Sequence, residues 1–219
     1  MKYRCLVLDH DDTVVNSTAT IHYPAFLEYM KKERPGPTLS LEEYFLYNFD
    51  PGVIPMFRDI CGLSEKEMEE EELFWKDYVK GHIPSAYPGI REILRNHKAA
   101  GGLICVVSHS FSQYIRRDYE KNDLPEPDMV FGWDMEPSLR KPAPYSLYEI
   151  MKTCGLKPSE ILVLDDLKPG YDMARAAKVP FAAAGWANDV PEIEDFMRKN
   201  CDYYFKKVEE LASFLESAE

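Results

Sequence analysis

Short aliphatic runs recur along the chain, and each of the three strongest stops abruptly at a polar residue. These runs cover residues 5–8, 103–107 and 161–164, and the residues that follow them are Asp9, Ser108 and Asp165. Continuous apolar runs of this length are typical of strands that are buried on both faces of a parallel sheet. Weaker strands are predicted at 129–131, 181–184 and 203–205.

Helical patterns separate these predicted strands. Residues 89–100 and 145–154 fit helices that end at glycine, and further helices are predicted at 171–177 and 208–215. The alternation of strands and helices predicts an α/β fold, a Rossmann-like core with a mainly parallel sheet. Because ligands bind beyond the carboxyl ends of the strands in such sheets, we expect the three polar endings to gather at one site.

Residues 16–83 have a different character, because they contain aromatic-rich helical stretches and no aliphatic strand. Helices are predicted at 21–32, 41–47 and 65–78, with Pro and Gly between them. We therefore expect a small α-helical domain at 16–83, inserted into a core made of 1–15 and 84–219. The acidic run at 69–72 is interpreted as a solvated helix face, with Leu73 and Phe74 turned inward.

Composition limits the classes of function that need to be considered. The formal net charge of −12 argues against a nucleic acid partner, because proteins that bind nucleic acids usually present a basic surface. No apolar run approaches the roughly 20 residues that span a bilayer, and no membrane association is expected. The 5 scattered cysteines indicate neither a disulfide framework nor a zinc site, so a cytoplasmic location is expected. An anionic substrate would need a local cation.

Asp9 and Asp11 are the strongest candidates for chemistry. If the strand geometry continues past residue 8, both carboxylates lie on one side of the chain and His10 lies on the other. Two carboxylates at a strand end suit a pair in which one attacks and one moves protons, and they also suit a hard divalent cation. A polar turn would use the same residues, since Asp is common in turns.

The second acidic pair is Asp165 and Asp166, which follow the third aliphatic run. Adjacent buried acids repel each other unless a cation or a hydrogen-bond donor lies between them, and Mg²⁺ could supply that charge. A turn that caps the following helix would fit equally well. Lys141, placed before a helix and next to proline, is a candidate phosphate ligand, and the Ser108 hydroxyl could donate to a phosphate oxygen.

The order and spacing of these residues resemble the haloacid dehalogenase-like superfamily, in particular its phosphoglycolate phosphatase and β-phosphoglucomutase-like branch. The matching pieces are Asp9-x-Asp11-x-Thr13, Ser108 after an aliphatic strand, Lys141-Pro142 before a helix, and Asp165-Asp166 after another strand. The segments 87–90 and 165–170 match as well. The resemblance covers nearly all of residues 1–15 and 84–219. An α-helical cap after the first motif is typical of that branch.

The resemblance implies a mechanism with a role for each of these residues. Asp9 would attack phosphorus and form an aspartyl-phosphate, while Asp11 would act as general acid and then as general base. Ser108 and Lys141 would stabilise the transferring phosphoryl group, and His109 would contribute a backbone N–H. The implied ligands of Mg²⁺ are Asp9, the backbone carbonyl of Asp11, Asp165 and Asp166.

The substrate implied by the resemblance is a small phosphorylated metabolite, and the sequence leaves its identity open. Phosphoglycolate, a sugar phosphate, a nucleotide and pyrophosphate all remain candidates. Arg58, in the helical segment, could meet an anionic substrate, although a surface arginine would have the same sequence context. Asp12 occupies a position where glycine is frequent in the family, and Asp tolerates the backbone angles that such a position requires.

Other functions use some of the same residues. A sugar phosphomutase would use the same four pieces and transfer the phosphoryl group to another sugar position. A two-metal phosphoesterase would use His10 and His109 as metal ligands. A catalytically silent regulatory protein could keep the same fold, although it would be expected to lose Asp9, Asp11 or the acidic pair. A true dehalogenase would have no use for Asp11 and the acidic pair.

Overall fold

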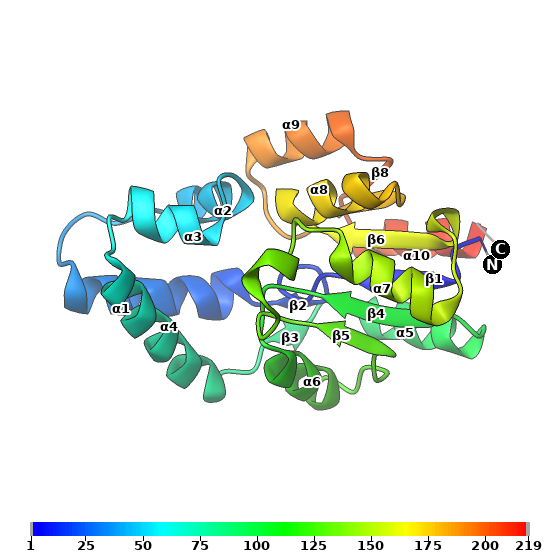
Figure 1. The fold of residues 1–219 in the computed structure, drawn as a ribbon, viewed down its shortest axis with the longest axis horizontal. Helices are drawn as coiled ribbons and strands as arrows, with labels where there is room; N and C mark the ends of the chain where they lie inside the picture. The colour runs from blue at the N-terminus through cyan, green and yellow to red at the C-terminus, as the bar shows by residue number, and fades with distance from the viewer. Residues whose placement is uncertain (1, 218–219) are drawn as a thin grey trace.

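A parallel sheet of six strands forms the centre of the part of the chain that the computed structural model describes, residues 2–217 (Figure 1). The strand order is β5-β4-β1-β6-β7-β8. The strand bounds are β1 Cys5–Leu8, β4 Leu103–Val107, β5 Met129–Phe131, β6 Ile161–Asp165, β7 Phe181–Ala184 and β8 Tyr203–Phe205. The predicted α/β, Rossmann-like fold is confirmed. β6 extends one residue beyond the predicted strand and includes Asp165.

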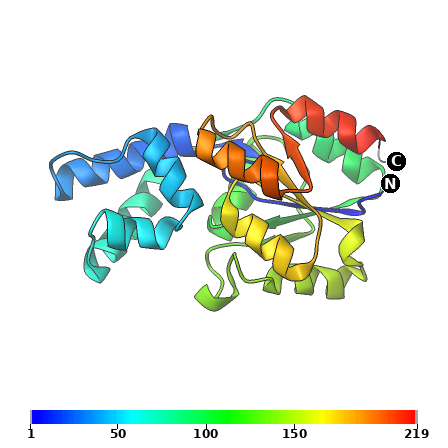
Figure 2. The ribbon, with the colours of Figure 1, turned by 90° about the horizontal axis from the view of Figure 1, so that it is seen from above.

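The two faces of the sheet are covered by different helices, as Figure 2 shows from above. One face packs on α5, α6 and α10, and the other packs on α7, α8 and α9. The helix bounds are α5 Ile90–Ala99, α6 Ser112–Lys121, α7 Tyr145–Cys154, α8 Lys168–Ala177, α9 Pro191–Asn200 and α10 Val208–Ser217. Within β1, Leu6 and Leu8 point to the first face and Cys5 and Val7 to the second. Burial on both faces explains why the strands are continuous apolar runs.

A helical insert lies between the short strands β2 (Val15–Asn16) and β3 (Ser85–Ala86). Its helical elements are a π-helical turn at Thr18–His22, α1 Tyr23–Glu33, α2 Leu41–Phe49, α3 Val53–Pro55, a second π-helical turn at Met56–Ile60, and α4 Glu65–Lys80. Capping boxes start α2 at Ser40 and α4 at Ser64. The insert has an aromatic cluster of its own, which contains Phe26, Tyr29 and Phe57.

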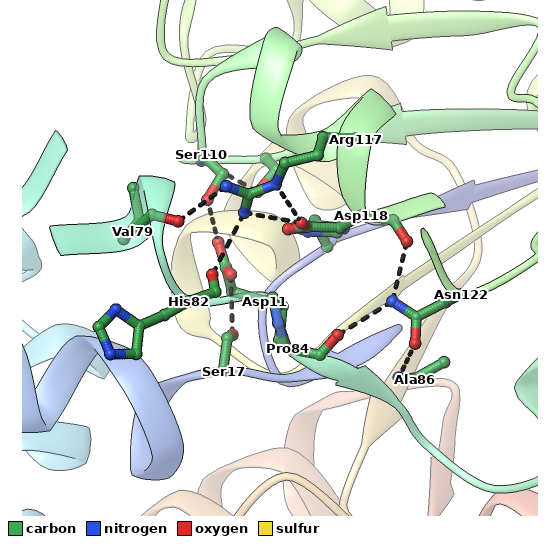
Figure 3. A network of polar contacts seen from close by, with 12 residues as sticks. Asp11, Ser17, Val79, His82, Pro84, Ala86, Ser110, Arg117, Asp118 and Asn122 are labelled. Atoms are coloured by element: carbon green, nitrogen blue, oxygen red, sulfur yellow. Dashed lines mark hydrogen bonds and ion pairs between the residues drawn. The ribbon is translucent and has the colours of Figure 1, made fainter. Parts of the chain in front are cut away.

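The two segments that connect the insert to the core lie side by side. β2 and β3 pair antiparallel, with Val15 opposite Ala86. Helix α6 binds the segment in which the chain returns from the insert to the core. Arg117 donates to the carbonyl of Val79 at 2.7 Å, and Asn122 donates to the carbonyl of Pro84 at 2.9 Å (Figure 3). On the other side of the insert, the ring of Phe49 on α2 packs edge-on against Phe196 on α9, with the ring centroids 5.2 Å apart.

The structure corrects part of the interpretation of the acidic run on α4. Phe74 packs inward against the aromatic cluster, as predicted, but Glu71 is 9% exposed and faces inward, whereas Leu73 is 65% exposed. Glu71 shares a helix face with Trp75 and the buried Val79, four and eight residues further on, and this face packs toward the core. None of the helices among residues 2–217 is long and apolar enough to cross a membrane.

Candidate active site

A cavity of about 180 Å³ lies at the carboxyl ends of β1, β4 and β6, below the helical insert. These three strands are neighbours in the sheet, so the residues that follow them meet. The predicted site residues that line the cavity are Asp9, Asp11, Ser108, His109, Lys141 and Asp166. Asp165, at the end of β6, is fully buried beside them.

The loop after β1 is a tight turn that continues the sheet for one residue. The N–H of Asp9 donates to the carbonyl of Leu164 at 2.9 Å, and the carbonyl of His10 accepts from the N–H groups of Val14 and Val15. Asp12 takes the left-handed conformation with φ of 56°, in which Asp is tolerated better than most residues. An Asp at this position therefore keeps the turn that glycine would allow.

The Asp12 carboxylate has a local structural role. One of its oxygens accepts from the backbone N–H of Ser17 at 3.3 Å and from that of Thr18 at 3.2 Å, where the insert begins. Burial raises the pKa of Asp12 to about 6, and the neighbouring Asp11 adds to this effect. Asp12 thus adds a buried acid to the site and fixes the first turn of the insert.

Three buried carboxylates, those of Asp9, Asp165 and Asp166, place oxygen atoms within 4.8 Å of one another. Two neighbours orient the pair at the end of β6: the Thr13 hydroxyl donates to Asp166 at 3.2 Å, and the N–H of Leu167 donates to Asp165 at 2.8 Å. Helix α8 approaches so closely that only glycine fits next to Asp165. A Cβ on Gly170 would lie 2.0 Å from a carboxylate oxygen of Asp165.

Lys141 connects the strand ends. Its ammonium group donates to Asp9 at 2.8 Å and to Asp165 at 2.7 Å, and all three side chains are at most 5% exposed. Burial alone would lower the pKa of Lys141, but the charges of Asp165 and Asp9 outweigh it and raise the pKa. Lys141 is therefore a fixed positive charge in contact with the Asp9 carboxylate.

One lysine does not compensate the acids that surround it. Burial raises the pKa of Asp165 to about 7, although Lys141 opposes the shift, and it raises the pKa of Asp166 well above the ordinary value. Among the described residues that line the cavity, Lys141 is the sole lysine or arginine. Carboxylate oxygens are the ligands that hard divalent cations prefer, so this donor set fits such an ion.

Asp11 is surrounded by hydrogen-bond donors. It accepts from Ser17 at 2.8 Å, from the Nε2 of His22 at 2.9 Å, and from the Ser110 hydroxyl. Figure 3 shows the contacts with the two serines. Burial favours a higher pKa, but His22 and Ser110 outweigh it and lower the pKa of Asp11. Asp11 is thus held as a carboxylate in this arrangement.

His22 links Asp11 to the insert. Its Nδ1 accepts from the indole N–H of Trp75 at 2.9 Å, and because indole N–H can only donate, the N–H of the imidazole is on Nε2, toward Asp11. The sequence does not reveal the contacts that Asp11 makes with Ser17, His22 and Ser110. Each contact depends on how segments separated in sequence pack in the fold.

Ser108 and His109 lie side by side after β4. The hydroxyl of Ser108 accepts from the N–H of Ser110 at 3.1 Å, and the Nε2–H of His109 donates to the carbonyl of Lys141 at 3.1 Å. Burial and the nearby Lys141 lower the pKa of His109 to about 3, so its ring is neutral. The ring therefore positions the loop that carries Lys141 and adds no charge.

Two predicted candidates lie away from this constellation. Arg58 does not line the cavity, and its guanidinium pairs with the exposed neighbouring Asp59 at 2.7 Å; the expectation that it meets substrate is not supported by its position. His10 points to the other side of β1, as alternation predicted, where Asp118 binds it at 3.1 Å. No histidine belongs to the acidic group within residues 2–217, so neither His10 nor His109, the ligands of the two-metal alternative, is part of it.

Comparison with known proteins identifies the family of the chain. Residues 6–184 match the family model described as haloacid dehalogenase-like hydrolase. Phosphoglycolate phosphatase of Pseudomonas syringae pv. tomato is 23% identical over 192 residues, which cover 84% of this chain and 70% of that protein. Phosphoglycolate phosphatase 1 of Pseudomonas aeruginosa is 24% identical over 189 residues, which cover 82% and 68%.

Solved structures share the whole fold at low sequence identity. A predicted phosphoglycolate phosphatase from Haemophilus somnus has a TM-score of 0.78 and 18% identity, covering 98% of this chain and 99% of that one. CbbY from Rhodobacter sphaeroides, solved with xylulose 1,5-bisphosphate, has a TM-score of 0.68 and 15% identity, covering 94% and 95%. These structures show the fold, whereas the match of residues 6–184 to the family model establishes that the chain belongs to the haloacid dehalogenase-like hydrolases and, with its phosphatase relatives, that it is a phosphohydrolase.

Proposed function

We propose that this enzyme is a Mg²⁺-dependent phosphatase that hydrolyses a small phosphomonoester through an aspartyl-phosphate on Asp9. One observation carries the proposal: the Asp9 carboxylate contacts the Lys141 ammonium at 2.8 Å and lies within 4.8 Å of two further acids, at the floor of a cavity. This arrangement combines a nucleophile, a fixed cation and a set of hard oxygen ligands in a single place.

In the first step, an oxygen of Asp9 forms a bond to phosphorus while the bond from phosphorus to the ester oxygen breaks. The electron pair goes to the ester oxygen, which takes the proton of the Asp11 carboxyl and leaves as an alcohol. In the second step, a water attacks phosphorus, Asp11 takes the proton of that water, and the bond to Asp9 breaks. Inorganic phosphate leaves and both carboxyl groups return to their initial state.

Asp11 can hold a proton in the first step because its partners can reverse their roles. Ser17 and Ser110 donate to the Asp11 carboxylate in this structure, and a serine hydroxyl can rotate to accept instead. The carboxylate form, which the present hydrogen bonds favour, is the base that the second step requires. His22 would keep the carboxyl group aimed in one direction during both steps.

Mg²⁺ would be held by Asp9, Asp165 and Asp166, with the backbone carbonyl of Asp11 as the further ligand that the family resemblance implies. When bound, the ion supplies positive charge to the phosphoryl oxygens and offsets the repulsion among the buried acids. Ser108 and Lys141 supply a hydroxyl donor and a second positive charge.

We further propose that residues 16–83 form a cap over a core made of 1–15 and 84–219. Aromatic side chains of this cap and of the core line the cavity, and closure of the cap over the strand ends would exclude bulk water from the reaction. A cavity of about 180 Å³ suits a small metabolite rather than a macromolecule. A cytoplasmic location is proposed because all five cysteines are free thiols.

The test is phosphate release from a panel of small phosphomonoesters, measured with added Mg²⁺ and after chelation. We expect activity with Mg²⁺ and loss of activity with the chelator. Asp166→Asn should raise the Mg²⁺ concentration that gives half-maximal rate by about tenfold or more, because it replaces an anionic ligand by a neutral one.

The exposed Asp77→Asn provides a matched control, with an unchanged Mg²⁺ requirement. Full activity in the presence of chelator would contradict the metal dependence. If the enzyme isomerises a hexose 1-phosphate without net phosphate release, the assignment changes from phosphatase to phosphomutase.

A further inference from the structure

Glu71 on α4 is a buried acid that the mechanism does not use. It is 9% exposed and lines the cavity from the side of the insert, opposite the strand ends. Within the described residues it makes no hydrogen bond and no ion pair. Its neighbours on α4 differ: the exposed Glu70 pairs with Lys66 at 3.2 Å, and Glu72 accepts from Lys76 and, at 3.4 Å, from the indole of Trp133.

A carboxylate in this position is costly, because burial reduces its contact with water and no hydrogen bond or ion pair with the described residues compensates. Burial raises the pKa of Glu71 to about 7, and the charge of Glu72 adds to this effect. A buried carboxylate that lines a cavity and has no partner among the described residues is suited to a ligand that carries the opposite charge. For a carboxylate, that partner is a cation.

Aromatic side chains line the same part of the cavity. Trp75 lies one helical turn after Glu71 on α4, and Tyr44 lies on α2. Trp133, which follows β5 in the core, already has the guanidinium of Arg140 over its ring, 4.0 Å from the centroid. Aromatic faces attract ammonium groups, most strongly where water is excluded, and tryptophan is the best of them. Carboxylate and aromatic rings together form a site for an organic cation.

In the described structure the insert offers no lysine or arginine to the cavity, and its one cavity-lining histidine, His22, is bound to Asp11. Arg34 is bound to Glu67, Arg58 to Asp59, and Lys76 to Glu72. A substrate whose alcohol part carries a carboxylate, as phosphoglycolate does, would meet the two acids Glu71 and Glu72 at this wall.

We propose that the phosphomonoester hydrolysed by this enzyme carries an ammonium group on its alcohol part, and that Glu71 with the ring of Trp75 binds that group. The proposal rests on the proposed function and names the substrate class. The phosphate would lie on Lys141 and Ser108, and the ammonium group would lie at the wall of the insert. The net charge of −12 is consistent with such a substrate, because the ammonium group cancels part of the phosphate charge and the ester is repelled less than one without it.

The test compares three esters of nearly equal length that differ in one terminal group. They are 2-aminoethyl phosphate, 2-hydroxyethyl phosphate and phosphoglycolate, which end in an ammonium group, a hydroxyl and a carboxylate. We expect kcat/KM to be highest for the aminoethyl ester. Glu71→Gln should lower kcat/KM for this ester by about tenfold or more, the loss expected for a charge-assisted contact, and leave the hydroxyethyl ester within about twofold. The control Glu70→Gln should change neither.

A binding measurement separates this proposal from the phosphatase assignment. Choline and its neutral carbon analogue 3,3-dimethylbutan-1-ol are titrated calorimetrically into the wild-type enzyme, Glu71→Gln and Glu70→Gln. Choline should bind more tightly than the analogue in the wild type and Glu70→Gln, and this preference should disappear in Glu71→Gln. If the wild type prefers choline over the analogue but hydrolyses none of the esters, the phosphatase assignment is refuted and the cation site is retained. Hydrolysis of phosphoglycolate as fast as of the aminoethyl ester, or equal binding of the two alcohols, would overturn the cation site.

Discussion

Replacing Asp9 by Asn is expected to reduce phosphate release by at least about 10³-fold, because an amide cannot serve as the nucleophile that a carboxylate provides. The substitution is nearly isosteric, and its side-chain oxygen can still accept from Lys141, which contacts Asp9 at 2.8 Å in the wild type. The loss should therefore appear in kcat with the fold intact. Initial rates at saturating Mg²⁺, together with circular dichroism and thermal melting of both proteins, check this expectation.

Asp77→Asn is the matched control, because Asp77 is an exposed acid on α4 whose side chain is 85% accessible. It should have the wild-type rate. If Asp9→Asn released phosphate as fast as this control, the assignment of the nucleophile would be wrong.

Replacing Lys141 by Met is expected to affect both rate and stability. The loss of a fixed positive charge at the phosphoryl group should lower kcat by about 10²–10³-fold, the size seen when one electrostatic stabiliser is removed. In the metal-free protein the carboxylates of Asp9 and Asp165 would lose the ammonium group that both contact. Removing one partner of a buried ion pair lowers the free energy of unfolding by about 3–5 kcal/mol. Steady-state kinetics and chelator-treated thermal melts measure the two effects.

The stability loss in Lys141→Met should depend on pH in a defined direction. Burial already raises the pKa of Asp165 to about 7 although Lys141 opposes the shift, so the pKa should rise further in the variant. A carboxyl whose pKa is higher in the folded state binds more protons there, and its stabilising effect is lost as the pH rises. The difference in Tm from the wild type should thus be larger at pH 8 than at pH 5. Lys152→Met, at an exposed lysine on α7, should show no such difference. Equal melting of Lys141→Met and the wild type would contradict a structural role for the lysine.

The parallel sheet was predictable from sequence because strands buried on both faces must be continuous apolar runs, and six such runs are strands in the structure. Helices α6 and α9 were not predicted, and α9 buries only a narrow stripe. In α9 the buried residues are Ile193 and Met197, and the remaining positions are polar or partly exposed. The two-residue strands β2 and β3 have no pattern at all, since their pairing depends on where the insert leaves and rejoins the core.

The site was predictable to the extent that its residues end buried strands. Asp9, Ser108 and Asp165 meet because β1, β4 and β6 are neighbours. The contacts of the insert could not be found in this way. Glu71 belongs to a run of four acids, and only the packing of α4 against the core decides which of them faces inward. The spacing of Glu71, Trp75 and Val79 was the available signal, since residues four apart share a helix face.

The central claim is a covalent bond between phosphorus and Asp9, and chemical trapping tests it most directly. The enzyme is mixed with excess substrate and Mg²⁺, quenched in acid during turnover, and treated with borohydride, which reduces an acyl phosphate to an alcohol. Peptide mass spectrometry then locates the modified residue. We predict homoserine at position 9 in a substrate-dependent manner. Reduction at another acid, or none at position 9 while turnover proceeds at the normal rate, would contradict the account.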